Sequence, residues 1–348
     1  MTCLDSRNDY MLMVKSILKQ HCPERNRWAR SFFVFNLIAL VCLVTGCAHL
    51  HFGPLMEPLE EKVLSGDGAD KILILDVEGV ISNQAKKSMT GFQVEIGMIE
   101  KVREILSRAE KDKAIKALMV RINSPGGTVT SSDIIHHELK KFKERNNVKI
   151  YASIIDLAAS GGYYIAVAGD KIIAHPTSLS GSIGVIAMIV NLEELFNKVG
   201  VDWEIVKSAE KKDFLSPFRA LTKEERVLFQ ETIDSFHNRF VQIVADNRKE
   251  LNIPSVKELA DGRIFTAQEA RDNKLIDEIG YLDDVISLIK KDLQLSNPRI
   301  VMYHRPGQYK TNMYSSLPGS PIINFLNINL GLDMMGGAGP RFMYLWLP

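Results

Sequence analysis

A serine and a pair of glycines each follow a predicted strand of this chain. Ser160 opens a Ser-Gly-Gly segment after the run 148–155, and Gly126 and Gly127 follow the run 115–122. A serine hydroxyl there, flanked by bare backbone N–H groups, can attack a carbonyl carbon and stabilise the oxyanion that forms. The N–H of Gly161 would lie beside that oxygen, where the dipole of the following helix favours negative charge.

Both segments also have a simpler explanation. Serine is one of the commonest helix N-cap residues, so Ser160 taken alone is explained at least as well by a cap. Pro-Gly-Gly after Ser124 is typical of an ordinary turn between a strand and a helix. Neither segment defines a site by itself.

A nucleophilic serine needs a base, and the run 207–217 offers lysines. It contains Lys207, Lys211 and Lys212, whereas no histidine has an obvious acidic partner to orient it. A lysine can act as the base when burial lowers its pKa from about 10.4 toward about 7 or 8. Lysines in polar runs are usually solvated, so this run alone does not select one of the three.

The elements that must position these residues alternate between strand and helix. Apolar runs at 72–77, 115–122 and 148–155 predict buried strands, and helical spacing at 95–111 and 130–145 predicts two helices between them. Strands that alternate with helices across short connections indicate βαβ units and a parallel sheet, hence an α/β fold. Ligands of such sheets gather at the carboxyl ends of the strands.

Shorter signals predict the elements of the second half. In chain order they are a helix at 161–168, β-like runs at 172–173 and 185–190, a helix at 191–198, a strand at 203–206, a long helix from Thr222 to about 249 and a shorter helix from Thr266. Thr222 with Glu225, and Thr266 with Glu269, form the capping-box pattern.

The N-terminal segment is typical of export or membrane anchoring. Three arginines between 25 and 30 precede an apolar run at 32–44, which ends in Thr-Gly-Cys47. This ending is similar to a bacterial lipobox, in which Cys47 would be lipidated and become the new N-terminus. An uncleaved membrane helix that continues to Phe52 also fits. Both arrangements place the body of the chain outside the cytoplasm.

Composition argues against several classes of protein. The 348 residues carry a net charge of +1, without a basic excess that would attract nucleic acid. The four cysteines all lie in the first 47 residues, so the body can hold neither a disulfide framework nor a cysteine zinc site. We therefore expect no metal and no nucleic-acid partner.

Five segments together resemble one family of peptidases. They are Ser-Pro-Gly-Gly (124–127), Ala-Ser-Gly-Gly-Tyr-Tyr (159–164), Leu-Ser-Gly-Ser-Ile-Gly-Val (179–185), Lys-Asp-Phe-Leu-Ser-Pro (212–217) and Asp-Gly-Arg-Ile-Phe-Thr-Ala-Gln-Glu-Ala (261–270). In this order they are similar to the short, single-domain signal peptide peptidase A family. The resemblance implies a Clp protease/crotonase-like spiral of ββα units with a parallel sheet, and a serine peptidase with a Ser-Lys dyad.

The resemblance also assigns roles to individual positions. The nucleophile falls on Ser160 and the base on Lys212, with Lys211 and then Lys207 as alternatives. Ser182 would orient the lysine amine. The oxyanion donors would be the backbone N–H groups of Gly127 or Gly126 and of Gly161.

The predicted function is a membrane-associated, ATP-independent serine endopeptidase without a cofactor. It would cleave membrane-proximal peptides such as released signal peptides, on the periplasmic side of a bacterial membrane. The family resemblance implies a homo-oligomer in which a neighbouring subunit helps to complete the active site. Two alternatives are a crotonase-like enzyme acting on a thioester, which secretion disfavours, and a non-catalytic membrane scaffold, which the matching serine and lysine disfavour.

The same observations predict four regions. They are a leader with a signal or anchor at 1–50, a linker at 51–70, the catalytic domain at 71–295 and a C-terminal extension at 296–348. The extension ends in an apolar run at 342–347, which would be an aggregation hazard in water. We expect this run to dock, either in a groove of its own subunit or as a strand added to a neighbour.

Overall fold

The computed structural model describes residues 58–84, 86–87, 94–306, 312–315 and 342–347. The predicted leader, the anchor and Cys47 lie outside these residues. Among the described helices, none has the length and apolar character needed to cross a bilayer.

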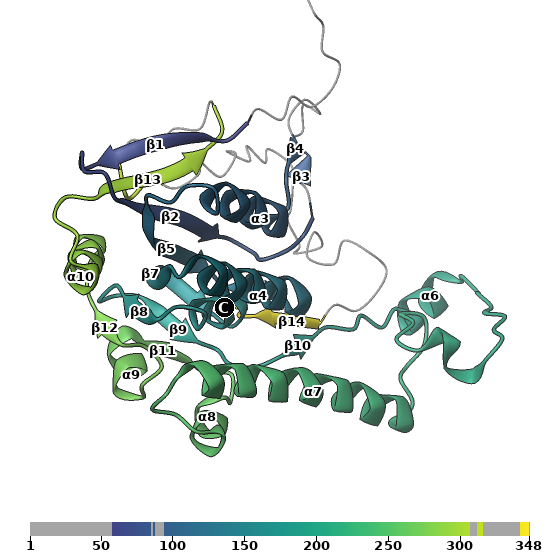
Figure 1. The fold of residues 1–348 in the computed structure, drawn as a ribbon. Helices are drawn as coiled ribbons and strands as arrows, with labels where there is room; N and C mark the ends of the chain where they lie inside the picture. The colour runs from purple at the N-terminus through teal and green to yellow at the C-terminus, as the bar shows by residue number, and fades with distance from the viewer. Residues whose placement is uncertain (1–57, 85, 88–93, 307–311, 316–341, 348) are drawn as a thin grey trace, which may run out of the picture. The chain divides into compact units, whose positions relative to one another are not determined.

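A nine-stranded sheet lies at the centre of the described chain (Figure 1). Its order is β1-β13-β2-β5-β7-β8-β12, and β9 and β11 extend it beside β7. The strands are β1 (Glu60–Ser65), β2 (Lys71–Glu78), β5 (Ile115–Ser124), β7 (Lys149–Ala159), β8 (Lys171–Ala174), β9 (Leu179–Gly181), β11 (Ile264–Thr266), β12 (Glu278–Ile279) and β13 (Arg299–His304). All pairs from β13 to β12 are parallel, whereas β1 and β11 add antiparallel edges. The predicted parallel sheet is confirmed.

Helices cover both faces of this sheet, because successive residues of a strand point to opposite sides. In β2, Leu73 and Leu75 pack toward α3 (Met98–Ala109) and α4 (Val129–Asn146). Ile72 and Ile74 pack on the other side, against α10 (Leu282–Leu293). Burial on both faces explains why the run 72–77 is apolar throughout rather than alternating.

Two capping boxes begin helices where the sequence predicts them. Thr222 and Glu225 cap α7 (Lys223–Asn247), and Thr266 and Glu269 cap α9 (Ala267–Asp272). In the last third of α7, Phe240, Val241 and Val244 enter the core that α3 and α4 also share. The short helices α5 (Gly161–Ala166) and α8 (Ile253–Leu259) complete the packing around α7.

The segment between β9 and α7 departs from prediction. The run 203–206 forms no strand, and the run 185–190 contributes only β10 (Ile186–Ala187). The predicted strand is wrong because its backbone has no partner strand among the described residues, and Val206 is 92% exposed. The helix in this segment is α6 (Glu193–Val199), which lies beyond the N-terminal end of α7 in Figure 1.

The C-terminal run docks within its own chain. β14 (Phe342–Leu345) lies between β6 (Gly126–Thr128) and β10 and pairs antiparallel with both. The prediction that this run docks is confirmed, and of the two arrangements considered the structure has the one within the subunit. A separate antiparallel pair joins β3 (Lys86–Lys87) to β4 (Val94–Glu95).

Candidate active site

Ser160 occupies a strained turn between β7 and α5. Its φ of 50° and ψ of −113° lie outside the regions that non-glycine residues favour. Such a conformation costs about 1–3 kcal/mol and persists only where the surrounding structure fixes it. Here the Ser160 N–H donates to the Gly181 carbonyl oxygen at 2.7 Å, and the side chain is 1% exposed. The fold therefore holds this serine in an unfavourable geometry at the end of a central strand.

The hydroxyl of Ser160 does not cap the helix that follows. Ser160 stands at the N-cap position of α5, yet its side chain accepts no hydrogen bond from the helix backbone. Within the described part of the chain, its Oγ makes only a long contact, 3.5 Å to the carbonyl oxygen of Gly184. The structure thus removes the simpler explanation of this residue and leaves the hydroxyl available for chemistry.

Ser182 stands beside Ser160 at the same edge of the sheet. β7 and β9 run parallel, and Ala159, the last residue of β7, lies opposite Gly181, the last residue of β9. Ser160 and Ser182 directly follow these two residues, so the two serines leave the sheet side by side. Both serines have a positive φ, 50° and 49°, and Ser182 is also buried. The backbone N–H of Ser182 donates to the Arg263 carbonyl oxygen at 2.7 Å, which fixes its position from a second side. The structure brings these two predicted residues together.

The predicted oxyanion glycines also converge on this point. Gly126 has a φ of +103°, and a Cβ there would lie 2.8 Å from the backbone nitrogen of Gly161. However, the Gly126 N–H already donates to Ser124 Oγ at 3.1 Å. Gly127 lies opposite Tyr344 in the antiparallel pair of β6 and β14, so its backbone N–H is part of that ladder, and hydrogen bonding in this structure does not favour one of the two glycines over the other.

Ser124 has a structural role that the sequence analysis does not predict. Its side chain is fully buried, and its Oγ donates to the Gly79 carbonyl oxygen at 2.7 Å while accepting from Gly126. These two bonds hold the glycine turn against the end of β2. The signal was a polar residue at the end of an otherwise apolar strand, directly before Pro-Gly-Gly.

β14 fills a groove next to these residues. The Phe342 ring packs on those of Phe229 and Phe236, with centroids 5.3 and 5.1 Å away. The Tyr344 ring stacks on Tyr164 at 5.1 Å, and its hydroxyl donates to the Phe236 carbonyl oxygen at 2.8 Å. Alternate side chains of an extended segment thus enter aromatic pockets between two edge strands.

A cavity of about 530 Å³ continues from this groove. Ser182 and Gly184 line it on one side, and Leu345 to Leu347 of the C-terminal run line it on another. Gly184 is the residue whose carbonyl Ser160 Oγ approaches. Open space therefore exists beside Ser182 and beside the residue that Ser160 Oγ contacts.

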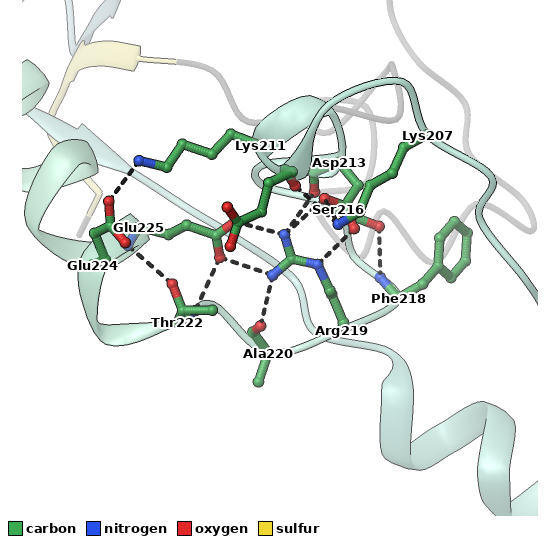
Figure 2. Close-up of polar contacts among 11 residues, drawn as sticks. Lys207, Lys211, Asp213, Ser216, Phe218, Arg219, Ala220, Thr222, Glu224 and Glu225 are labelled. Atoms are coloured by element: carbon green, nitrogen blue, oxygen red, sulfur yellow. Dashed lines mark hydrogen bonds and ion pairs between the residues drawn. The ribbon is translucent and has the colours of Figure 1, made fainter.

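The structure does not bring Lys212 to Ser160 within one chain. Lys212 lies in the 3₁₀ turn η1 (Glu210–Asp213). Its side chain is exposed, and the side-chain amine has no hydrogen-bond or ion-pair partner among the described residues. Lys207 is paired with Asp213 at 2.8 Å, and Lys211 with Glu224 at 2.6 Å (Figure 2). The hydrogen bond to Glu224 raises the pKa of Lys211, which lowers the fraction of neutral amine that could accept a proton near neutral pH.

Comparisons with known proteins identify the family to which this chain belongs. The model of peptidase family S49 matches residues 142–296, and the model of the Clp protease family matches residues 79–179. A protein named "Putative signal peptide peptidase SppA" from Enterococcus faecium is 36% identical over 260 residues, which cover 75% of this chain and 74% of that protein. Protease 4 of Haemophilus influenzae is 30% identical over 72% of this chain and 39% of its own length.

A solved structure of a ClpP1 mutant from Listeria monocytogenes covers 62% of this chain and 94% of its own, at 17% identity and a TM-score of 0.39. The sequence matches define an α/β protein of the serine-type peptidases. Within that class, the chain belongs to peptidase family S49, as its resemblance to signal peptide peptidase A predicts.

Proposed function

We propose that this chain is an ATP-independent serine endopeptidase with Ser160 as nucleophile and Lys212 of a neighbouring subunit as base. The observation that carries the proposal is the geometry of Ser160. This serine is strained, uncapped, and placed beside Ser182 at the carboxyl edge of a parallel sheet, directly before Gly161, whose backbone nitrogen Gly126 approaches. Structural serines rarely need a conformation of this kind, whereas functional sites often contain one.

In this proposal the chemistry follows the usual course of acyl transfer. The neutral lysine amine takes the Ser160 proton as Oγ attacks the scissile carbonyl carbon. The N–H groups of Gly127 and Gly161 stabilise the oxyanion, and the protonated lysine then gives its proton to the leaving amine. Water activated by the same lysine hydrolyses the acyl-enzyme. Ser182 would hold the amine in line by a hydrogen bond.

The groove between β6 and β10 supports an extended peptide as substrate. Both edge strands present backbone groups to β14, so a peptide in its place would gain main-chain hydrogen bonds on each side. The pockets that hold Phe342 and Tyr344 would receive alternate apolar side chains of that peptide. Apolar segments such as released signal peptides, named in the relative from Enterococcus faecium, have this character.

The surface that carries Lys212 supports assembly with a second copy of this chain. Leu195, Val199 and Val206 lie exposed on the segment between β10 and α7, which also carries Lys212. Several exposed apolar side chains on one short segment are a feature of surfaces that bind another protein. A neighbour that covered this surface would bury the Lys212 amine and could place it at a Ser160. A homo-oligomer therefore supplies the base that one chain does not bring to its own serine.

Removal of the C-terminal run tests whether the groove binds substrate. A chain that ends at Gly336 lacks β14, so peptides should reach Ser160 without displacing it. We expect hydrolysis of an apolar peptide to become several-fold faster, chiefly through a lower KM, because a competing intramolecular strand acts at an effective concentration of about the mM range. Peptide turnover is measured by mass spectrometry, beside the mass of the assembly by light scattering.

A synthetic peptide of residues 340–348 provides the matching control. Added to the shortened protein, it should inhibit competitively and restore the slow rate. A shortened protein that keeps both the full assembly and an unchanged KM, and that the peptide does not inhibit, would contradict substrate binding in this groove.

We further propose that residues 1–50 tether the enzyme to a bacterial membrane through Cys47. This proposal rests on the Thr-Gly-Cys47 ending after the apolar run. Cys47→Ser should abolish palmitate labelling and leave a precursor that migrates more slowly. Residues before Cys47 detected in the membrane-bound wild-type protein would instead indicate an uncleaved helix.

A further inference from the structure

The turn that carries Lys212 is built around charged residues that are much less exposed than the lysine itself. The side chains of Asp213 and Glu225 are 7% and 5% exposed, and Arg219 lies between them. Buried charges are costly unless they are paired and fully hydrogen-bonded. This cluster therefore calls for an explanation beyond that of a solvated surface turn.

Arg219 uses all of its guanidinium nitrogens in this cluster (Figure 2). Nε and one terminal nitrogen donate to the two carboxylate oxygens of Asp213, at 2.8 and 3.0 Å. The terminal nitrogens also donate to the two carboxylate oxygens of Glu225, at 2.8 and 2.6 Å. A further bond of 3.1 Å reaches the Ala220 carbonyl oxygen. One arginine thus binds two carboxylates, one in η1 and one in the first turn of α7.

The two carboxylates connect the turn to the core of the protein. Asp213 directly follows Lys212 and is the last residue of η1. In this turn the Lys212 N–H donates a hydrogen bond to the Ala209 carbonyl oxygen at 3.1 Å. Glu225 is part of the capping box of α7, where its carboxylate accepts from the Thr222 N–H at 2.9 Å. Because Phe240, Val241 and Val244 anchor the later turns of α7 in the core, the bonds of Arg219 connect Lys212 to a helix that the core holds in place.

We propose that Arg219 is a positioning residue for the base. Its forked bonds to Asp213 and Glu225 fix the backbone at Lys212, so that the lysine is presented to the serine of a neighbouring subunit in one geometry. This role rests on the proposed function of Lys212. A lysine at position 219 would keep the charge but could not bridge two carboxylates in this fork.

The cluster stays charged over the whole range in which a lysine base operates. Hydrogen bonds from Arg219 are the main cause that holds the pKa of both Asp213 and Glu225 below the ordinary carboxylate range. Carboxylates with a depressed folded-state pKa stabilise the fold above their unfolded value near 4, and this stabilisation is lost only as the pH falls through the folded value. Activity measured from neutral to alkaline pH therefore reports on an intact cluster.

The test compares Arg219→Gln and Arg219→Lys with wild type in the full-length protein. We expect kcat to fall by about 10- to 100-fold in both, since a displacement of the order of 1 Å at a reacting group has an effect of this size. KM should stay within about twofold, because the substrate groove lies elsewhere. Asp213→Asn combined with Arg219→Gln should be no slower than the slower single variant, because the residues act as one unit.

Arg248→Gln is the matched control for loss of a buried forked pair. Arg248 bonds both carboxylate oxygens of Asp277, at 2.8 and 3.0 Å, at the other end of α7. Its loss should lower the melting temperature as much as Arg219→Gln does, while kcat and the assembly mass stay at wild-type values. A fall in kcat for Arg248→Gln equal to that for Arg219→Gln would reduce Arg219 to a purely structural role and overturn the proposal.

Lys212→Ala, measured in parallel, separates this proposal from the function on which it rests. Full activity of Lys212→Ala would overturn the assignment of the base, and the positioning role with it. An inactive Lys212→Ala beside a fully active Arg219→Gln would overturn the positioning role alone. An inactive Lys212→Ala with a slow, correctly assembled Arg219→Gln supports both.

Discussion

Ser160→Ala and Lys212→Ala should each lower kcat on peptides by on the order of 10³- to 10⁶-fold, with little change in melting temperature. The serine variant removes the nucleophile, and the alanine at 212 removes the base, so either change stops acyl transfer. The double variant should be no slower than the slower single one, because the two residues act in the same step. Steady-state turnover and thermal unfolding of the three purified variants measure this.

Substitutions at Lys211 and Lys212, together with the pH dependence of activity, test which lysine is the base. Lys211→Ala should keep most of the activity, since Lys211 is paired with Glu224. Lys212→Arg should not rescue turnover, because a guanidinium stays protonated at all relevant pH values. Wild-type activity should rise from neutral into mildly alkaline pH, as a lysine acts as a base only when neutral. An essential Lys211 beside a dispensable Lys212, or maximal activity below about pH 6, would contradict this assignment.

Mixing two inactive variants should restore activity if neighbouring subunits share the site. In an assembly of Ser160→Ala and Lys212→Ala chains, some interfaces join an intact serine to an intact lysine. In a head-to-tail ring formed by random mixing of equal amounts, about a quarter of all sites combine an intact Ser160 with an intact Lys212. We therefore expect roughly a quarter of wild-type turnover after the two proteins are dissociated together and reassembled.

The control for mixing is the same procedure with Ser160→Ala and the double variant. No interface in that mixture contains both residues, so activity should stay at background. Background activity in the first mixture, with mixed assemblies demonstrated by mass spectrometry, would mean that serine and lysine must come from one chain.

Local sequence patterns predict much of this fold. The runs of β2, β5 and β7 are strands because they are apolar on both faces, and the two capping boxes begin α7 and α9 at the expected threonines. The run 203–206 has the composition of a strand, but a strand also needs a partner. Since pairing is a long-range property, composition alone could not reveal that this run lies exposed without a ladder.

Local sequence patterns also predict part of the candidate site, but not the contacts that depend on long-range pairing. Ser160 and the glycines follow strands, and parallel strands bring such residues to one edge. The pairing of β7 with β9, which sets Ser160 beside Ser182, depends on a register that the residues do not reveal. Three further features depend on tertiary contacts that local sequence patterns do not specify. They are the hydrogen bond from the Gly126 N–H to Ser124, the pairing of β14 with β6, and the bonds of Arg219 to the carboxylates of Asp213 and Glu225.

Identification of the serine that a mechanism-based label modifies tests most directly whether Ser160 is the nucleophile. Full-length protein is treated with a fluorophosphonate or a β-lactone, digested with trypsin and sequenced by mass spectrometry. With Ser160 as nucleophile and a lysine as base, we expect one adduct, on Ser160, which forms faster as the pH rises from neutral and is absent from Ser160→Ala. An adduct on another serine, or labelling of Ser160→Ala at the wild-type rate, would contradict Ser160 as the nucleophile.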